Sequence, residues 1–250
     1  MTKKVLWVVD GSRDRLLDRA TYIGASAVAV RTTNNWLKAA MPAFKAKNID
    51  VLAWRWPGVR PADTAGHYFA LEEAQFVVEE LIPAGLSGYI VDAESDGPDH
   101  PGDDWDHANL DTLAANFCDT IKTAGRKKTP NFLFGITSGR KYPTSFPNIP
   151  WKTFVQCADA VYPQFYWYGD SGPEGGGTPQ SAFDSGMKSW KTLNFGAMRI
   201  VPIIGQIAHV KATEISSYSA ILNANKFDEV HFYSDTTAVP QANYDAMKSL

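Results

Sequence analysis

Two carboxylates stand one residue apart at the end of an apolar run in this sequence. The run covers residues 88–94, with the letters GYIVDAE, and ends in Asp92 and Glu94. Residues two apart on a β-strand point to the same side, so both carboxylates would share one face while Ala93 faces the other. Carboxylates held close together push their pKa values apart, so that one stays protonated beside an ionised neighbour. The pattern is typical of acid–base chemistry.

Other apolar runs also end in polar or aromatic residues. The first run ends in Asp10, and the last ends in Tyr233 and Asp235. The remaining candidates are a set of aromatic and amide residues near run ends or in the loop after Glu94: Trp54, Trp56, Trp105, Gln164, Tyr166 and Trp167. If these residues meet, four carboxylates would lie among aromatic rings, which offer flat apolar faces with a polar edge. Such a surface suits a sugar chain.

The elements that must position these residues alternate regularly. Continuous apolar runs predict strands over residues 4–10, 26–31, 50–56, 88–94, 131–138, 159–167, 198–206 and 229–235. Amphipathic segments predict helices over residues 13–24, 34–48, 68–85, 107–126, 151–158, 179–194, 213–225 and 238–250. In the helix at 68–85, Phe69, Phe76 and Val77 fall at helical spacing, opposite acidic residues.

Eight strand–helix units in 250 residues predict an α/β protein, a single-domain (β/α)8 TIM-type barrel over residues 1–250. A doubly wound sheet is the alternative, but no GxGxxG follows the first strand. Active sites of such barrels lie at the carboxyl ends of the strands, so the polar ends would converge there. Glycoside cleavage needs a proton donor and a second negative group, which the carboxylates would supply.

Composition excludes several other classes. The net charge of -3 argues against a nucleic-acid partner, and no apolar run approaches the ~20 residues of a membrane helix. The first apolar stretch is too short for a Sec signal and runs into Asp10. Cys118 and Cys157 fit no metal or CxxC spacing, so we expect two buried thiols. We expect a monomer that needs no cofactor.

The quoted residues carry a resemblance to a known family. A strand that ends in D-x-E after a helix of the type YFALEEAQFVVEEL resembles the family 25 glycoside hydrolases, muramidases with a (β/α)8-like barrel that cut peptidoglycan. In that family an aspartate ends the first strand and another lies near the last, the places of Asp10 and Asp235. The resemblance implies Glu94 as general acid, supported by Asp92, Asp10 and Asp235, and a polysaccharide as the substrate.

The family 18 chitinases are the second resemblance. Their fourth strand reads D-G-x-D-x-D-x-E, and the sequence keeps Gly88, Asp92 and Glu94 of that text, with Ile90 in place of one aspartate. The segment YPQFYW is similar to the sixth strand of plant-type members. Under this resemblance Asp92 would orient an N-acetyl group as internal nucleophile, and Tyr166 would assist it.

Two loops allow further interpretations. Residues 94–109 contain several aspartates with His100 and His107, but the spacing matches no metal loop, so an acidic groove rim is favoured over a calcium or zinc site. Residues 169–180 are glycine-rich without a Gly-Lys-Ser/Thr ending, which favours a loop beside the groove over a phosphate cradle. His67, His209 and His231 are interpreted as structural.

The sequence therefore predicts a glycoside hydrolase acting on a β-1,4-linked N-acetylhexosamine polymer, with peptidoglycan first and chitin second. A barrel that binds glycan without cutting it is the alternative from another class, and an enzyme for a non-acetylated glucan is a third. A peptidoglycan enzyme without a Sec signal is the pattern of a phage lysin acting on the bacterial cell wall. A cytoplasmic protein, or one secreted by a non-Sec route, is the other expectation.

Overall fold

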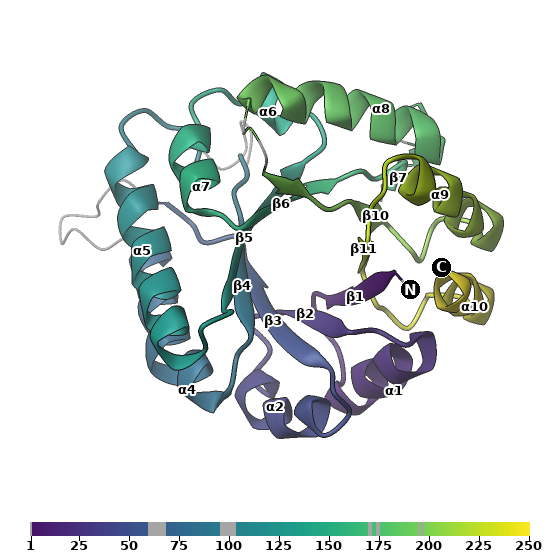
Figure 1. Cartoon of the computed structure of the whole chain (residues 1–250), viewed down its shortest axis with the longest axis horizontal. Coiled ribbons are helices and arrows are strands. Elements are labelled where there is room, and N and C mark those ends of the chain that lie inside the picture. Colours follow the sequence, from purple (N-terminus) through teal and green to yellow (C-terminus); the bar gives the residue numbers. More distant parts are fainter. Residues whose placement is uncertain are drawn as a thin grey trace.

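In the computed structural model, the strands form one closed parallel barrel with the helices around it (Figure 1). The structure describes residues 2–59, 69–95, 104–169, 172, 173, 176–194, 196 and 198–250. Within these residues the barrel strands are β1 (Lys3–Val8), β2 (Ala27–Arg31), β3 (Asp50–Arg55), β4 (Gly88–Asp92), β5 (Leu133–Gly139), β6 (Ala160–Gln164), β9 (Arg199–Ile200), β10 (Ile203–Gly205) and β11 (Glu229–Tyr233).

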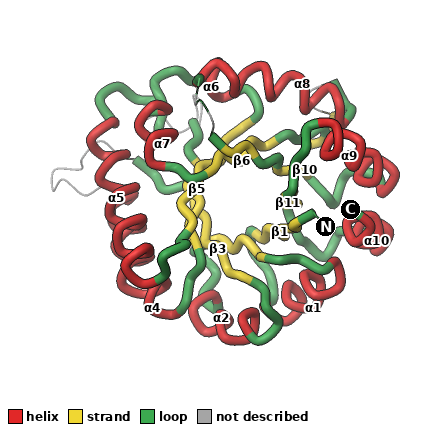
Figure 2. Tube along the Cα trace, in the orientation of Figure 1, coloured by secondary structure: helices red, strands yellow, loops and turns green. Residues whose placement is uncertain are grey.

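Helices follow the strands and cover the outside of the barrel (Figure 2). They are α1 (Arg13–Ile23), α2 (Leu37–Lys45), α3 (Phe69–Phe76), α4 (Ile82–Ala84), α5 (Asp111–Lys128), α6 (Tyr142–Ser145), α7 (Trp151–Cys157), α8 (Pro179–Trp190), α9 (Ala212–Ala224) and α10 (Gln241–Ser249). A π-helical turn (Val77–Leu81) joins α3 to α4, and a 3-10 turn (Lys191–Leu193) ends α8. The predicted (β/α)8 barrel is confirmed. No described helix is both long and apolar enough to cross a membrane.

The strand order explains how the barrel closes. Neighbours follow the chain from β1 to β6, and β11 pairs in parallel with β1. The seventh strand is predicted as one run over 198–206 but forms two pieces, β9 and β10, on either side of Pro202. Proline lacks the N–H that a continuous ladder needs. The piece β9 pairs with β6 through Arg199 and Ile200, whereas β10 completes the ring where Ile203 pairs with Gln164.

Side-chain alternation divides the core into two layers. The inward cluster includes Val5, Trp7, Leu52, Trp54 and Ile90, which fill the barrel. The larger outer cluster lies between strands and helices and includes the alternating strand residues Leu6, Val8, Ala53, Val91 and Ala93. This is the two-residue period of a strand whose two faces are both buried. It confirms that Ala93 faces the helical layer.

Helix α3 buries a different face from the one predicted. Ala70, Ala74 and Val77 are buried on this segment, whereas the side chains of Phe69 and Phe76 are among the exposed large apolar groups. The two phenylalanines were predicted to share the apolar face with Val77, and only Val77 does so. Small alanines let the helix lie close to the barrel.

The loops and cysteines can now be placed. In the glycine-rich stretch 169–180, the described part contributes to a short hairpin of β7 (Tyr168–Gly169) and β8 (Gly172–Pro173). Both cysteines are free: Cys118 is buried, and Cys157 is half-buried. His67 and His100 lie outside the described residues.

Candidate active site

Asp92 and Glu94 lie together at the carboxyl end of β4, on the inward face that also carries Ile90. The Nε2 group of Gln164 at the end of β6 donates to Asp92 Oδ1 (3.1 Å) and to Glu94 Oε1 (2.9 Å). One amide therefore bridges both carboxyl groups. Asp92 is buried and Glu94 is half-buried, so the pair lies at the base of an opening rather than on an open loop.

The electrostatics of this pair favour one shared proton. Burial raises the pKa of Asp92 well above its ordinary value, and the charge of Glu94 and a hydrogen bond to it raise that pKa further. Gln164 acts in the opposite direction because it donates to the ionised form. The neutral form of Asp92 is thus stabilised beside Glu94. This is the arrangement in which two carboxyl groups divide acid and base roles.

Two cavities open at this end of the barrel, and Glu94 lines both. The first measures about 490 Å³ and is lined by Asp92 and Glu94 with residues from β2, β3 and the end of β11, among them Arg31, Trp54, Trp56 and Tyr233. The second measures about 420 Å³ and is lined by Glu94, Gln164, Tyr166, Arg140 and Tyr142. Glu94 therefore stands between two spaces that could each hold part of a chain-like ligand.

Strand parity decides which predicted aromatic residues reach these cavities. Trp54, Trp56 and Tyr233 line the first cavity and Tyr166 the second. Tyr166 and Tyr233 stack with ring centroids 5.4 Å apart, which places a continuous aromatic surface between the cavities. All four rings follow the inward residues of their strands at intervals of two.

Trp167 and Trp105 were predicted to bind substrate, but the structure buries both in the helical layer. Trp167 has the opposite parity to Tyr166, is fully buried and stacks on Tyr218 of α9. Trp105 is fully buried between α5 and α7, with its ring centroid 4.9 Å from that of Phe154. Neither indole exposes a face on which a sugar could stack. The backbone N–H of Trp105 donates to Glu94 O (3.1 Å), so this residue anchors the loop that returns to the site.

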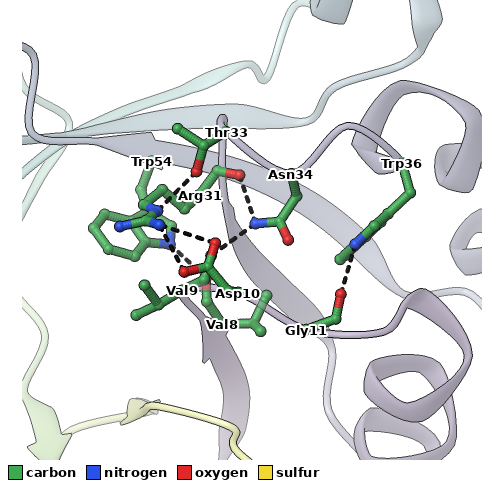
Figure 3. Close-up of polar contacts among 9 residues, drawn as sticks. All are labelled: Val8, Val9, Asp10, Gly11, Arg31, Thr33, Asn34, Trp36 and Trp54. Carbon is green, nitrogen blue, oxygen red and sulfur yellow. Dashed lines mark hydrogen bonds and ion pairs between the residues drawn. The ribbon is translucent and has the colours of Figure 1, made fainter.

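Asp10 is not among the residues that line either cavity, and Figure 3 shows its carboxylate facing the guanidinium of Arg31. Val5, Trp7 and Val9 take the inward positions of the first strand, so Asp10 has the outward parity. Its exposed carboxylate accepts from Arg31 Nη2 at 2.9 and 2.7 Å, while Arg31 Nε donates to Thr33 Oγ1 (2.8 Å). Asp10 therefore contacts Arg31, a residue that does line the first cavity.

Asp235 was predicted to lie with the other carboxylates of the site, but its side chain points into the helical layer. Its Oδ1 accepts from Arg15 Nη2 of α1 (3.1 Å) and from the hydroxyl of Tyr244 in α10. Strand β11 ends at Tyr233, so the two-residue alternation does not extend to Asp235. Asp235 therefore links α1 to α10. The structure does not bring it close to Asp92 and Glu94.

Several residues that line the cavities were not among the predicted site residues, and Phe69, Arg55 and Tyr142 are three of them. Phe69 lines the first cavity from the start of α3 with about half of its surface exposed, and Arg55 lines the same cavity. Tyr142 lines the second cavity from the short helix α6. The only sequence signal was the position of Arg55 beside Trp54 and Trp56 at a strand end. Phe69 was assigned to the buried face, and α6 was not predicted.

The described part of the acidic loop forms local contacts. Asp104 accepts from Ser95 Oγ (3.0 Å) and from the backbone N–H of Asp106 (3.0 Å), and lies 3.2 Å from His107 Nε2. Among the described residues, no three His, Cys, Asp or Glu side chains are grouped to hold a metal ion. Residues 96–103 of this loop lie outside the described residues.

Comparison with solved structures identifies barrels of the same architecture. The glycoside hydrolase domain of PgaB (BpsB) from Bordetella bronchiseptica has a TM-score of 0.65 at 10% identity, covering 99% of this chain and 98% of that chain. The ICChI chitinase from Ipomoea carnea has a TM-score of 0.61 at 14% identity, covering 99% of both chains. A family 18 N-acetylglucosaminidase from Paenibacillus barengoltzii has a TM-score of 0.62 at 12% identity, covering 100% and 99%.

Similarity at this level of identity shows the shared barrel fold. No protein-family model matches the sequence, and a search of curated proteins found no match. The structural neighbours named above are glycoside hydrolases, and chitinases are among them. The likeness to family 25 muramidases suggested by the sequence has no counterpart among these three neighbours.

Proposed function

We propose that this protein is a glycoside hydrolase that cleaves β-1,4-linked N-acetylhexosamine polymers, with Glu94 as general acid. The observation that carries the proposal is the Asp92–Glu94 pair, bridged by Gln164 and placed between two cavities at the carboxyl end of the barrel. Strand ends on this face are where such barrels carry their chemistry. The glycosidase neighbours are consistent with this proposal.

The chemistry follows from the shared proton. The raised pKa of Asp92 favours its neutral form, so in this mechanism the proton of the resting pair lies on Asp92 beside Glu94. Transfer of that proton to Glu94 makes Glu94 the acid that protonates the glycosidic oxygen as the bond to the leaving sugar breaks. Asp92 is then the anion, and it stabilises the positive charge that develops on the remaining sugar or orients its acetamido group. A water oxygen then forms the new bond to the anomeric carbon, while the ionised Glu94 takes a proton from that water and so regains the proton it gave to the leaving sugar. Gln164 holds both carboxyl groups in place through the transfer.

The substrate follows from the aromatic lining and the neighbours. Trp54, Trp56 and Tyr166 offer apolar ring surfaces at the two cavities. The chitinase and the N-acetylglucosaminidase among the neighbours favour a chitin-type chain as the first substrate to test. Peptidoglycan, the first substrate expected from the sequence, has the same kind of N-acetylhexosamine backbone and is the second. Asp10 supports the site by fixing Arg31 at its rim.

The test compares wild type with Glu94→Gln on chitooligosaccharides and on peptidoglycan. We expect Glu94→Gln to lower kcat by about 10²- to 10⁴-fold, the usual worth of a general acid, while the dissociation constant for the glycan changes little. The matched control is Glu80→Gln, which alters an exposed carboxylate paired with Lys38 on the outside of the barrel. A wild-type protein that binds glycan and cleaves none would instead identify a glycan-binding barrel.

A further inference from the structure

A line of buried hydrogen bonds runs through the interior of the barrel beneath the first cavity. Trp7 Nε1 donates to His231 Nδ1 (2.9 Å), and His231 Nε2 lies 2.8 Å from Glu229 Oε1. Glu229 Oε2 in turn accepts from Arg199 Nη2 (3.0 Å). His231 is fully buried, and its ring stacks on Tyr162 with centroids 4.6 Å apart. The sequence analysis gave this histidine no partner.

The partners of His231 determine its tautomer. An indole N–H only donates, so Nδ1 of His231 must be the unprotonated nitrogen and Nε2 must carry the hydrogen given to Glu229. Burial lowers the pKa of His231, although Glu229 acts against this, so the ring keeps the lone pair that Trp7 requires. The imidazole therefore fixes the indole of Trp7 from one side.

Trp7 in turn packs against the wall of the first cavity. Its ring centroid lies 5.3 Å from that of Trp54 and 6.2 Å from that of Tyr233. Trp54 and Tyr233 contact each other at 6.1 Å, and both line the cavity with Glu94. Trp54 also donates from Nε1 to Val8 O (3.1 Å), so its orientation depends on the same strand that carries Trp7.

We propose that His231 is a positioning residue of the candidate site. By holding the Trp7 indole, it sets the orientation of Trp54 and Tyr233, and thereby the affinity of the cavity for its sugar ring. The identity of that ligand rests on the proposed function, whereas the positioning itself does not. His231 touches neither the carboxylate pair nor the cavity, so its effect must pass through Trp7.

The first measurement needs no glycan. We follow the solvent-exchange rate of the Trp54 indole N–H by NMR, with its signal assigned by Trp54→Phe. Trp7→Phe keeps a ring but removes the N–H donated to His231, and should raise the exchange rate about three- to tenfold. The matched control is Trp190→Phe. Trp190 is a fully buried tryptophan of α8 whose Nε1 has no hydrogen-bond partner among the described residues, and the rate should not change.

The second measurement is glycan affinity. Trp7→Phe should raise the dissociation constant for a chitooligosaccharide about three- to tenfold, and Trp190→Phe should leave it unchanged. At His231 we compare His231→Leu, which removes both hydrogen bonds, with His231→Gln, whose amide can accept from Trp7 and donate to Glu229. His231→Gln should restore the slow Trp54 exchange that His231→Leu loses.

The outcomes separate this proposal from the proposed function. An unchanged Trp54 exchange rate in Trp7→Phe would overturn the positioning role, whatever the protein binds. Faster exchange in a protein that binds no glycan would support the positioning role and count against glycoside hydrolysis. If His231→Leu does not fold, the comparison of Trp7→Phe with Trp190→Phe still decides the question.

Discussion

At the level of single residues, Asp92 makes the free energy of unfolding depend on pH. Its pKa is raised in the folded protein by burial and by Glu94, whereas in the unfolded chain it returns to its ordinary value. Between these two values the folded protein binds more protons than the unfolded chain. The free energy of unfolding therefore falls as the pH rises through this window. The neutral carboxyl of Asp92 makes its full contribution to the free energy of unfolding below the pKa of Asp92 in the unfolded chain. This contribution is lost as the pH rises through the raised pKa of Asp92 in the folded protein.

We predict that Asp92→Asn removes the part of the fall in the free energy of unfolding with rising pH that comes from Asp92. The free energy of unfolding of the variant, relative to wild type, should increase as the pH is raised from about 4, the ordinary pKa of an aspartate, upward. Urea unfolding at a series of pH values measures it. Asp10→Asn is the control, since that carboxylate is exposed at the rim. A difference between Asp92→Asn and wild type that does not vary with pH would contradict the raised pKa.

The two thiols make a second prediction at this scale. A hydrogen bond from Cys118 lowers the pKa of the half-buried Cys157 thiol to about 7, while burial raises the pKa of Cys118. Because the thiolate is the nucleophile, iodoacetamide should alkylate Cys157 alone in the native protein. The rate should be half-maximal near the Cys157 pKa of about 7. Mass spectrometry of the peptides gives the site, and alkylation of Cys118 before urea is added would disprove the assignment.

At the element scale, Asp235 ties the first helix to the last. Arg15 of α1 and Tyr244 of α10 both donate to its carboxylate, so the helix that begins the outer ring is joined to the one that ends it. Asp235 was predicted to join the other carboxylates at the barrel mouth because it follows the last strand. That placement assumed that strand alternation continues beyond Tyr233, where β11 ends.

We predict that Asp235→Ala lowers the free energy of unfolding by about 1–3 kcal/mol, since Arg15 and the hydroxyl of Tyr244 lose the carboxylate that accepts from both. Its kcat and its dissociation constant for glycan should match those of wild type below the melting temperature. Chemical denaturation and steady-state kinetics on the same sample measure the two effects. A lower kcat with an unchanged free energy of unfolding would contradict the structural role and support a catalytic role for Asp235.

The strands also explain which of the predicted aromatic residues line the cavities. Trp54, Trp56 and Tyr166 share the parity of inward residues, whereas Trp167 is one position out of phase with Tyr166. A one-residue step moves a side chain to the other face of a strand. Counting parity along each apolar run would have separated Trp167 from Tyr166 in the sequence, and would have given Asp10 the outward parity.

At the scale of the whole molecule, the two cavities come from opposite halves of the barrel. The first is built from β1–β4 with Tyr233, and the second from the ends of β5 and β6 with the short helix α6. Glu94 lines both, so a chain crossing the barrel mouth would place its scissile bond near the middle of the bound segment. Such an arrangement favours cleavage within a chain over removal of single terminal sugars.

We predict that a chitohexaose substrate yields dimers, trimers and tetramers as its first products. Chromatography at low conversion measures their distribution. Phe69→Ala removes an exposed ring that lines the first cavity and not the second, and it should shift the pattern of products. Phe76→Ala removes an exposed ring of the same helix that lines neither of these two cavities, and it should leave the pattern unchanged. Monosaccharide and pentamer as the only first products would contradict a groove that extends on both sides of Glu94.

Two features could be predicted from the sequence alone: the barrel, and the placement of Asp92 and Glu94 side by side at the end of one strand. Alternating apolar runs and amphipathic helices require a parallel sheet covered on both faces, and D-x-E spacing places two carboxylates on one face at a strand end. Only the tertiary structure decided which other residues join them. Three contacts join segments that are far apart in the chain. Gln164 bridges the carboxylate pair, Trp105 packs in the helical layer, and His231 accepts a hydrogen bond from Trp7. Hydrophobic pattern reports the layer in which a side chain is buried, and the partner it meets there is set by register and closure of the barrel.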